Sequence, residues 1–458
     1  MMTLAQITTA VGGTLHTDLA VTTVVTAVCT DSRAITAGCL FVAWVGERFD
    51  GHDFIDQSLE AGAVATICRR LPETLQSEKA YIVVPDTRLA LRDMAKAYRD
   101  GFEIPFLQIT GSVGKTTTKE LISAVLSVKK SVHKTPANYN NDIGTPLTLF
   151  GLRPEHEVAV IETGMNHFGE IRYLAQFVQP DIGIITNVGD AHVEFLGSRD
   201  GILQAKSELF EGLKPEGVAI LNGDDTLLNT VQLPQKILRC GTSDHCDIQV
   251  TAMTDLGLDG IACTVQTAQN TYELHIHALG KHMIYPVSMA VAVGELLGLS
   301  KAEIEAGVAG YRGVDNRMNV VRLGQNRIVL DDCYNASPQS MEAGLAVLKS
   351  TPAKRKIAII GDMGELGDYT QEAHYTIGKL AGSLGLDLVI TIGAKAADME
   401  KGARDAGGNV VHFATKEDAY DAIGKAFLPD TLVFVKASHF SMHFEDVVNY
   451  LKELDIHD

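Results

Sequence analysis

The residue types with the clearest chemistry form a glycine-rich turn, Thr110-Gly111-Ser112-Val113-Gly114-Lys115-Thr116-Thr117. The turn follows an apolar run at 106–110 that predicts a strand, and it leads into a helical pattern at 117–126. Glycines let successive backbone N–H groups point at one anion, and the N-terminus of a helix adds partial positive charge. We therefore predict a phosphate-binding loop, with an ordinary glycine-rich strand–helix turn as the alternative.

Each residue type in this loop has an expected task. The backbone N–H groups would surround the phosphates of a nucleotide. Lys115 would place its ammonium at the β- and γ-phosphates, and the Thr116 hydroxyl would bind Mg²⁺. Ile109 stands where the general pattern has glycine, so the loop is a shortened variant.

Three more polar groups follow at or near the ends of predicted elements. Glu162 ends the apolar run 158–161, His192 lies beyond the run 182–185, and Lys206 falls in a helical pattern. Parallel strands bring their carboxyl ends to one edge of a sheet, so Glu162, His192 and Thr116 could meet around one or two Mg²⁺ ions. Simpler interpretations stay open: a solvated loop carboxylate, a hydrogen-bonded loop histidine and a surface lysine.

Two later segments carry polar groups at predicted strand ends. Asp331-Asp332 follows the apolar run 328–330, and adjacent carboxylates there suit ribose hydroxyls or a metal ion. A pair of aspartates that caps a turn is the alternative. The glycine-rich segment 361–367 is a further strand-end loop that could contact substrate or simply turn the chain.

The elements that must hold these groups fall into three blocks of alternating strand-like and helix-like pattern. With 458 residues, a chain of about three domains is expected. Short apolar runs that end in polar or glycine residues indicate parallel sheets buried on both faces. We predict an α/β fold with a small N-terminal α/β domain at 1–104, a central P-loop ATPase-like domain with a parallel sheet at 105–313, and a C-terminal Rossmann-like domain at 314–458.

The composition limits the partners and the compartment. A formal net charge of -18 argues against nucleic acid, because phosphate backbones need a basic surface. The first residues have no charged region followed by an apolar one, and no apolar run is long enough to suggest a membrane span. The seven cysteines form no CxxC pair, which favours a reducing compartment. We expect a cytoplasmic protein that does not insert into a membrane.

Taken together, these segments resemble the Mur ligases over nearly the whole chain. The phosphate loop looks like the shortened loop of that family, and the segments at 162–164 and 187–192, which includes Asn187, are similar to its metal-binding segments. Lys206 falls where the family carries a carbamylated lysine. The resemblance implies that carbamylation turns this cation into an anion, which can then bind a second Mg²⁺.

Other segments match the substrate-binding motifs of the same family. The resemblance implies that the N-terminal block binds a UDP-sugar through Asp31, Ser32, Arg33, Asp50 and His52. The segments 138–149 and 332–341 favour the branch that adds D-alanyl-D-alanine, and they contain the candidate substrate-binding residues Asn138, Asn140, Asn141, Tyr334 and Asn335. Arg317 matches the family's hinge arginine between the second and third domains, and Asp331 and Asp332 are candidates for nucleotide binding.

The chain departs from the family pattern at two places. Pro286 follows Gly280-Lys281-His282 where the family has an asparagine that contacts adenine. Near the C-terminus the family's Lys-Gly-Ser-Arg becomes Lys436-Ala437-Ser438-His439, which removes a permanent planar charge.

The resemblance implies an ATP-dependent ligase of peptidoglycan synthesis. The carboxylate of a UDP-N-acetylmuramoyl-tripeptide would be phosphorylated by ATP, and D-alanyl-D-alanine would attack the acyl phosphate to give a pentapeptide. Lys115, Lys206, Glu162 and His192 are the expected catalytic residues, with ATP and two Mg²⁺ ions as cofactors, in a monomer. The alternatives are a GTP-dependent switch, favoured by Asn187-Val188-Gly189-Asp190, another Mur ligase, or a folylpolyglutamate synthetase.

Overall fold

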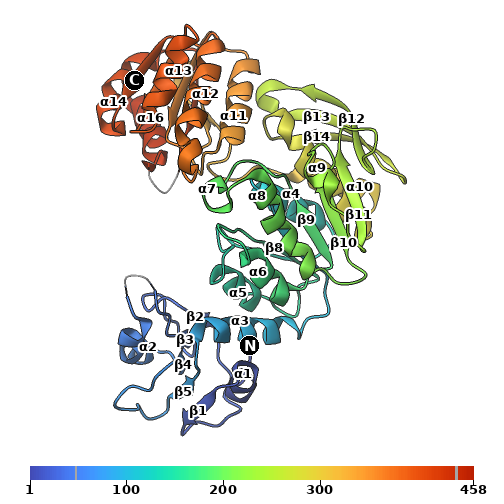
Figure 1. The fold of residues 1–458 in the computed structure, drawn as a ribbon, viewed down its shortest axis with the longest axis vertical. Helices are drawn as coiled ribbons and strands as arrows, with labels where there is room; N and C mark the ends of the chain where they lie inside the picture. Colours follow the sequence, from blue (N-terminus) through green and yellow to red (C-terminus); the bar gives the residue numbers. More distant parts are fainter. Residues whose placement is uncertain (47–48, 439–441, 458) are drawn as a thin grey trace.

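The computed structural model describes residues 1–46, 49–438 and 442–457. Sheets of 5, 9 and 6 strands follow one another along the chain, and helices cover them. Figure 1 shows the three resulting α/β domains, with the N-terminal one in blue, the central one in green and the C-terminal one in orange and red. The predicted three-domain α/β fold is confirmed.

The N-terminal domain is built on the smallest sheet. Its strands lie in the order β1 (Thr14–Thr17), β5 (Ala80–Val83), β4 (Ala65–Cys68), β3 (Leu40–Val42) and β2 (Val28–Cys29). Only β1 is antiparallel to its neighbour. The helical elements are α1 (Leu4–Val11), η1 (Gly51–Phe54), α2 (Ile55–Glu60) and α3 (Thr87–Arg99).

Helix α3 connects this domain to the next. Asp86 caps it by accepting hydrogen bonds from the backbone N–H groups of residues 88 and 89. One continuous apolar core reaches from Leu4 through Leu91 to Phe106 and Phe177 of the central domain. Figure 1 shows α3 lying against α5 (Gly144–Phe150) and α6 (Glu170–Val178). Because buried apolar area stabilises in proportion to its size, this shared core fixes the first two domains to each other.

The central domain carries the long sheet. Its strands lie in the order β14 (Thr271–Ile276), β13 (Ile261–Gln266), β12 (Ile248–Asp255), β11 (Lys236–Gly241), β10 (Val218–Asn222), β9 (Ile182–Ile185), β6 (Phe106–Thr110), β8 (Val158–Glu162) and β7 (Val132–Lys134). From β7 to β12 all neighbours are parallel, as predicted for the centre, whereas β12, β13 and β14 form an antiparallel extension that the sequence did not predict.

The remaining helical elements of the central domain flank this sheet. They are α4 (Lys115–Leu126), α7 (Val193–Leu196), α8 (Arg199–Ser207), η2 (Glu208–Glu211), η3 (Leu228–Thr230), η4 (Gly257–Asp259), η5 (Lys281–Met283), α9 (Ile284–Leu296) and α10 (Lys301–Gly310).

The C-terminal domain has helices on both faces of its sheet. The strands lie in the order β15 (Asn319–Arg322), β16 (Ile328–Asp331), β20 (Thr431–Lys436), β17 (Arg355–Gly361), β18 (Leu388–Ile392) and β19 (Val410–Phe413). Apolar side chains of α11 (Pro338–Ser350), α12 (Thr370–Ser383) and α13 (Ala397–Asp405) form one core with the sheet. Those of α14 (Lys416–Ala426) and α16 (Glu445–His457) form a second core. The described part of the domain also contains two 3₁₀ turns, η6 (Gly324–Asn326) and η7 (Gly367–Tyr369).

The order of the central strands positions the predicted chemistry. Strand β6 lies between β8 and β9, with Ile109 opposite Glu162 and Thr110 opposite Ile185. All three strands run in the same direction, so the loop after β6, the end of β8 and the segment after β9 emerge together. Within the described residues, no helix combines the length and apolar character needed to cross a membrane.

Candidate active site

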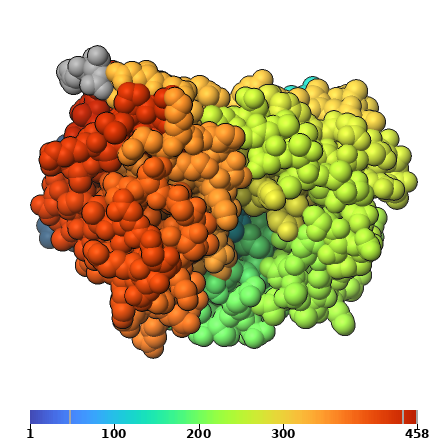
Figure 2. All heavy atoms as spheres, turned by 90° about the horizontal axis from the view of Figure 1, so that it is seen from above, coloured from blue at the N-terminus to red at the C-terminus, as the bar shows by residue number. Residues whose placement is uncertain are grey.

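A deep cleft lies where the three domains meet. Its volume is about 1840 Å³, and residues of all three domains line it, among them Arg88, Lys115 and Asp332. Figure 2 shows a hollow between the orange-red C-terminal domain and the green-yellow central domain. A cleft of this size, rich in polar side chains, can hold a large charged ligand.

The glycine-rich turn forms a loop at the floor of the cleft, and Asn187 shapes it. The Val113 N–H donates to Asn187 Oδ1 at 3.0 Å, and Asn187 Nδ2 donates back to the Val113 carbonyl at 3.0 Å. Thr186 Oγ1 donates to the same carbonyl at 2.7 Å. The Gly189 N–H donates to Ser112 Oγ at 2.9 Å. The segment after β9 therefore supports the phosphate loop through direct hydrogen bonds.

Gly111 is needed for this close approach. A Cβ atom at Gly111 would lie 1.8 Å from Thr186 Oγ1, whereas one at Gly114 (φ +80°) would have no atom within 4 Å. We expect Gly111→Ala to cost about 1–3 kcal/mol of stability through overpacking, and to weaken nucleotide binding because the loop must shift. Thermal melting and calorimetric titration with ATP measure the two effects.

Gly114→Ala is the matched control for that substitution. It introduces the same methyl group in a left-handed conformation, which costs about 1–2 kcal/mol for a residue with a side chain. However, it meets no neighbour that would force the loop to move. Equal nucleotide affinity for the two variants would contradict the role assigned to the Gly111–Thr186 contact.

Lys115 begins α4 inside the cleft. Its Nζ donates to the Gly111 carbonyl at 2.8 Å, so the side chain curls over the loop. Burial lowers the pKa of this amine, the nearby Glu162 carboxylate raises it, and the Arg317 guanidinium lowers it. Arg317 Nη2 in turn donates to Thr116 Oγ1 at 3.0 Å. Two cations and a hydroxyl thus converge where the phosphates of a nucleotide are expected.

Glu162 is held at the end of β8 rather than in a solvated loop. It is 2% exposed, and its Oε1 accepts a hydrogen bond from Asn140 Nδ2 at 2.9 Å. Its Oε2 lies 3.6 Å from Nζ of the buried Lys119 but takes part in no hydrogen bond among the described residues. A buried carboxylate oxygen without a donor is costly unless a cation or a ligand satisfies it.

His192 lines the cleft and contacts the C-terminal domain. Its Nδ1 is 2.8 Å from Glu365 Oε2, and its side chain is 17% exposed. Burial lowers the pKa of the imidazole, Glu365 raises it and Lys115 lowers it. Contact with His192 lowers the pKa of Glu365. His192, Glu365 and Lys115 all line the same cleft.

Lys206 is a buried residue of α8, not a surface lysine. It is 1% exposed, and no hydrogen bond or ion pair of its ammonium is found among the described residues. Burial, and secondarily the charge of Lys115, holds the pKa of its amine well below the ordinary value. The neutral form of a lysine amine is the one that adds to CO₂, and a lowered pKa increases the share of that form.

These groups provide a partial ligand set for a metal ion. The described residues contain no cluster of three or more His, Cys, Asp or Glu side chains suited to a metal. Glu162 Oε2, which accepts no hydrogen bond among the described residues, lines the cleft with His192 and Thr116 beside the phosphate loop, where a nucleotide would add its own oxygens. The residues therefore fit a hard divalent cation bound partly through phosphate.

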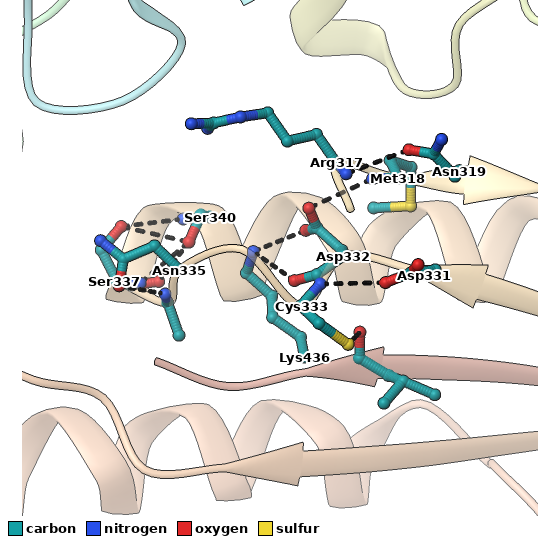
Figure 3. Close-up of polar contacts among 12 residues, drawn as sticks. Arg317, Met318, Asn319, Asp331, Asp332, Cys333, Asn335, Ser337, Ser340 and Lys436 are labelled. Atoms are coloured by element: carbon teal, nitrogen blue, oxygen red, sulfur yellow. Dashed lines mark hydrogen bonds and ion pairs between the residues drawn. The ribbon is translucent and has the colours of Figure 1, made fainter. Parts of the chain in front are cut away.

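Only one of the adjacent aspartates, Asp331 and Asp332, faces the cleft. Asp332 lines it, and its Oδ2 accepts from Lys436 Nζ at 2.6 Å while its Oδ1 accepts from the Met318 N–H at 3.2 Å (Figure 3). Asp331 is 5% exposed and accepts from the Cys333 N–H at 3.3 Å. Burial raises the pKa of Asp331, which is absent from the cleft lining.

Further predicted residues of the C-terminal domain lie on the same wall. The Arg317 guanidinium stacks over the Tyr334 ring at 4.1 Å, which fixes its direction toward Thr116. Asn335 Oδ1 accepts from Ser438 Oγ at 3.3 Å. Figure 3 shows Arg317, Asp332 and Asn335 around one loop region after β16. Both Tyr334 and Asn335 line the cleft.

The predicted substrate-binding residues divide into two groups. Asn138, Asn140 and Asn141 line the cleft, where Asn141 Oδ1 also accepts from the Gly144 N–H at 2.8 Å. The N-terminal group lies outside the cleft lining and consists of Asp31, Ser32, Arg33, Asp50 and His52.

The N-terminal group is already engaged in local contacts. Asp31 pairs with the exposed Arg33 at 2.7 Å, which lowers the pKa of the carboxyl to about 2. Asp50 caps η1 through the His52 N–H, and His52 Nε2 accepts from the Arg69 N–H at 2.8 Å. These bonds hold the turns of the domain in place.

The two departures from the family pattern also lie at the cleft. Pro286 and His282 line it together with the Asp332–Lys436 pair. Of Lys436-Ala437-Ser438-His439, the first three are described and His439 lies outside the described residues.

Three residues of this site were missed from the sequence. Lys119 lies one turn after Lys115 and looks there like any helical lysine, yet it is 1% exposed against Glu162. Gln339 bonds to Asp190 across the domain boundary, and Glu365 contacts His192. Gln339 and Glu365 both lie in strand-end segments that the sequence analysis identified. The sequence did not indicate which residue of the central domain each of them contacts.

Comparisons with known proteins cover the three domains in turn. The description "Mur ligase family, catalytic domain" matches residues 24–99, "Mur ligase middle domain" 109–294, and "Mur ligase, glutamate ligase domain" 316–439. A UDP-N-acetylmuramoyl-tripeptide–D-alanyl-D-alanine ligase of Bacillus subtilis is 36% identical over 98% of both chains. The protein of the same name from Escherichia coli is 35% identical over 99% of this chain and 98% of that one.

Solved structures give the same picture. A crystal structure of MurF from Acinetobacter baumannii matches with a TM-score of 0.91 and 33% identity over 99% of both chains. MurF from Thermotoga maritima in complex with ADP matches with a TM-score of 0.84 and 27% identity, over 94% of this chain and 98% of that one. A folylpolyglutamate synthase of Mycobacterium tuberculosis, at 16% identity and a TM-score of 0.63, shares the fold.

Proposed function

Because this chain belongs to the Mur ligase family, we propose that it joins D-alanyl-D-alanine to a UDP-N-acetylmuramoyl-tripeptide at the expense of ATP. The relatives that carry this activity in their names match over nearly the full length of the chain, so all three domains correspond. The single observation that carries the proposal is the cleft, in which the phosphate loop faces polar residues of all three domains.

The reaction requires activation of a carboxylate. The terminal carboxylate of the tripeptide attacks the γ-phosphorus of ATP, which forms a mixed anhydride and releases ADP. The free amine of D-alanyl-D-alanine then attacks the acyl carbon, loses a proton, and phosphate leaves. Lys115 offsets negative charge on the transferred phosphoryl group, and Arg317 adds a second cation beside Thr116.

Magnesium, when bound, would neutralise phosphate oxygens and polarise the transferred group. We assign Thr116, Glu162 and His192 to hold it, supported by the unsatisfied Glu162 Oε2. Lys206 contributes after its neutral amine adds CO₂, a step that forms an N–C bond, releases a proton and leaves a carbamate. The depressed pKa of this buried amine supports that modification.

The substrates occupy different parts of the molecule in this proposal. The N-terminal domain, within 1–104, takes the UDP end through the group Asp31, Ser32, Arg33, Asp50 and His52. Asn138, Asn140 and Asn141 contact the substrate inside the cleft. The domain at 314–458 contributes Asp332 to the ribose of ATP and Tyr334 and Asn335 to the incoming dipeptide, while the domain at 105–313 binds the phosphates.

An acyl phosphate hydrolyses in water, so the cleft must close over it before it forms. We propose that the C-terminal domain provides this closure, and that the enzyme acts as a monomer in the cytoplasm, where ATP and nucleotide sugars are made. The contacts between residue pairs 190–339 and 192–365 support an arrangement in which that domain docks on the central one.

The decisive test is which amine triggers phosphate release. With ATP, Mg²⁺ and the tripeptide substrate present, we expect phosphate release to reach one per amide formed once D-alanyl-D-alanine is added, and to stay at background without it. GTP should not replace ATP. Release with a folate and glutamate in place of these substrates would contradict the proposal and favour a folylpolyglutamate synthetase.

A further inference from the structure

We propose that Glu365 is a positioning residue that orients His192 when the C-terminal domain docks on the central domain. The two residues belong to different domains: His192 precedes α7, and Glu365 lies in the loop 361–367 after β17. Glu365 Oε2 is 2.8 Å from His192 Nδ1. The inference rests on the proposed function only in that His192 serves the phosphate and metal site.

His192 has a backbone that is held in a special conformation. Its φ is +67°, in the left-handed region that residues with a side chain rarely adopt. Such strain persists only where the surroundings impose it, and it is common at functional sites. Within the described residues, the polar group that faces His192 Nδ1 is the Glu365 carboxylate, which lies at ion-pair distance from it.

The loop that carries Glu365 is rigidly built. The Met363 N–H donates to Nε2 of the buried His374 at 2.9 Å, and the His374 Nδ1–H donates to the Thr370 carbonyl at 2.7 Å. On the other side, Asp362 Oδ1 accepts from the Ala396 N–H at 2.7 Å. Glu365 itself has φ +60°. Because these hydrogen bonds hold the loop on both sides, the Glu365 carboxylate has a fixed position when the C-terminal domain docks on the central domain.

The same loop makes the docking contact close. A Cβ atom at Gly367 would lie 3.1 Å from Glu194 of α7, and its φ is +53°. Figure 1 shows α7 as one part of the central domain that lies beside the C-terminal domain. The backbone of the loop therefore packs directly against Glu194 of α7. Only a residue as small as glycine at position 367 lets Glu365 approach His192.

The chemistry of a histidine ligand gives this contact its purpose. A carboxylate on one ring nitrogen fixes the tautomer and the orientation of the ring and raises the basicity of the other nitrogen. Removing such a partner typically costs about 10–100-fold in metal affinity or activity. Since Glu365 reaches His192 only with the domain docked, full ligand strength would coincide with closure.

The test compares Glu365→Gln with Asp368→Asn, a matched loss of charge three residues later, in η7. Asp368 is exposed and makes no hydrogen bond or ion pair within the described chain. Calorimetric titration of Mn²⁺ into the full chain with a non-hydrolysable ATP analogue should show affinity about 10–100-fold weaker for Glu365→Gln and unchanged for Asp368→Asn. In steady state, kcat should fall while KM for ATP stays near the wild-type value.

A double-mutant cycle separates positioning from direct binding of the metal by Glu365. On a His192→Ala background, Glu365→Gln should change Mn²⁺ affinity less than about twofold, because its only route of action is gone. A further loss on that background would make Glu365 a ligand itself, and wild-type affinity in the single variant would remove its role. Mn²⁺ binding does not require the ligation reaction. The binding experiment therefore still tests the role of Glu365 if the proposed substrates do not react.

Discussion

Lys115→Ala should abolish ATP-dependent phosphate release while the protein stays folded. The ammonium is the group of the phosphate loop that carries a full charge into the cleft, and it lies among Glu162, Arg317 and Glu365. Removing a pre-placed donor that stabilises transition-state charge typically costs about 10²–10³-fold in rate, and more is expected where that donor also binds the ground state. Phosphate release at saturating substrates measures the loss, and circular dichroism checks the fold.

Lys129→Ala is the control for that variant. Lys129 follows α4, is about half exposed, and pairs with Glu303 at 3.4 Å on the surface. Exposed pairs contribute about 0–1 kcal/mol, so activity should be unchanged and stability nearly so. Full activity of Lys115→Ala would remove the phosphate-loop assignment and, with it, the use of ATP at this site.

The geometry of the glycine-rich loop and of Glu162 beside it was predictable because its determinants are local or follow from strand direction. The strand β6, the turn and α4 are consecutive, so the pattern of residues 106–126 alone predicts a strand, a glycine-rich loop and a helix. Glu162 could be placed beside them because β8 is a buried parallel strand, and parallel strands align their carboxyl ends. The same rule brought the segment after β9 to the loop.

The pairing across domains could not be predicted. Glu365 and His192 each lie at a recognisable strand end, but nothing in the spacing of either segment indicates how one domain is turned toward the other. The same holds for Gln339 and Asp190. Contacts of this kind depend on the hinge conformation, where Asn316 and Met318 both adopt positive φ.

Backbone geometry explains why Asp331 and Asp332 have different surroundings. Successive side chains of an extended chain point to opposite faces. Asp331 ends β16 and points into the protein, so Asp332 points into the cleft toward Lys436. The sequence predicted a carboxylate at this strand end but treated the two residues alike. The antiparallel strands β12 to β14 were missed although β13 and β14 alternate regularly along their length, and only β12 carries an irregularity, a bulge between Val250 and Ala252.

Lys206→Met should remove most ligation and leave nucleotide binding intact. Methionine has nearly the shape of lysine and suits a buried site, so the packing under α8 should survive. It cannot add CO₂, so the site would lack the anion that the carbamate supplies. We expect loss on the order of 10²-fold or more in kcat, comparable with the removal of other groups that stabilise transition-state charge, with ATP affinity within about twofold of wild type by calorimetry.

The carbamate itself provides an independent readout. Wild-type protein equilibrated with ¹³C-bicarbonate should show a carbamate carbon resonance that Lys206→Met lacks, and activity should fall after removal of CO₂ and return with bicarbonate. Lys214→Met is the matched control, because the Lys214 side chain is 41% exposed and its ammonium already pairs with Asp181 at 2.7 Å. Normal turnover by Lys206→Met would refute the carbamate. The burial of Lys206 would then serve packing alone, although a buried amine without a partner is a poor choice for packing.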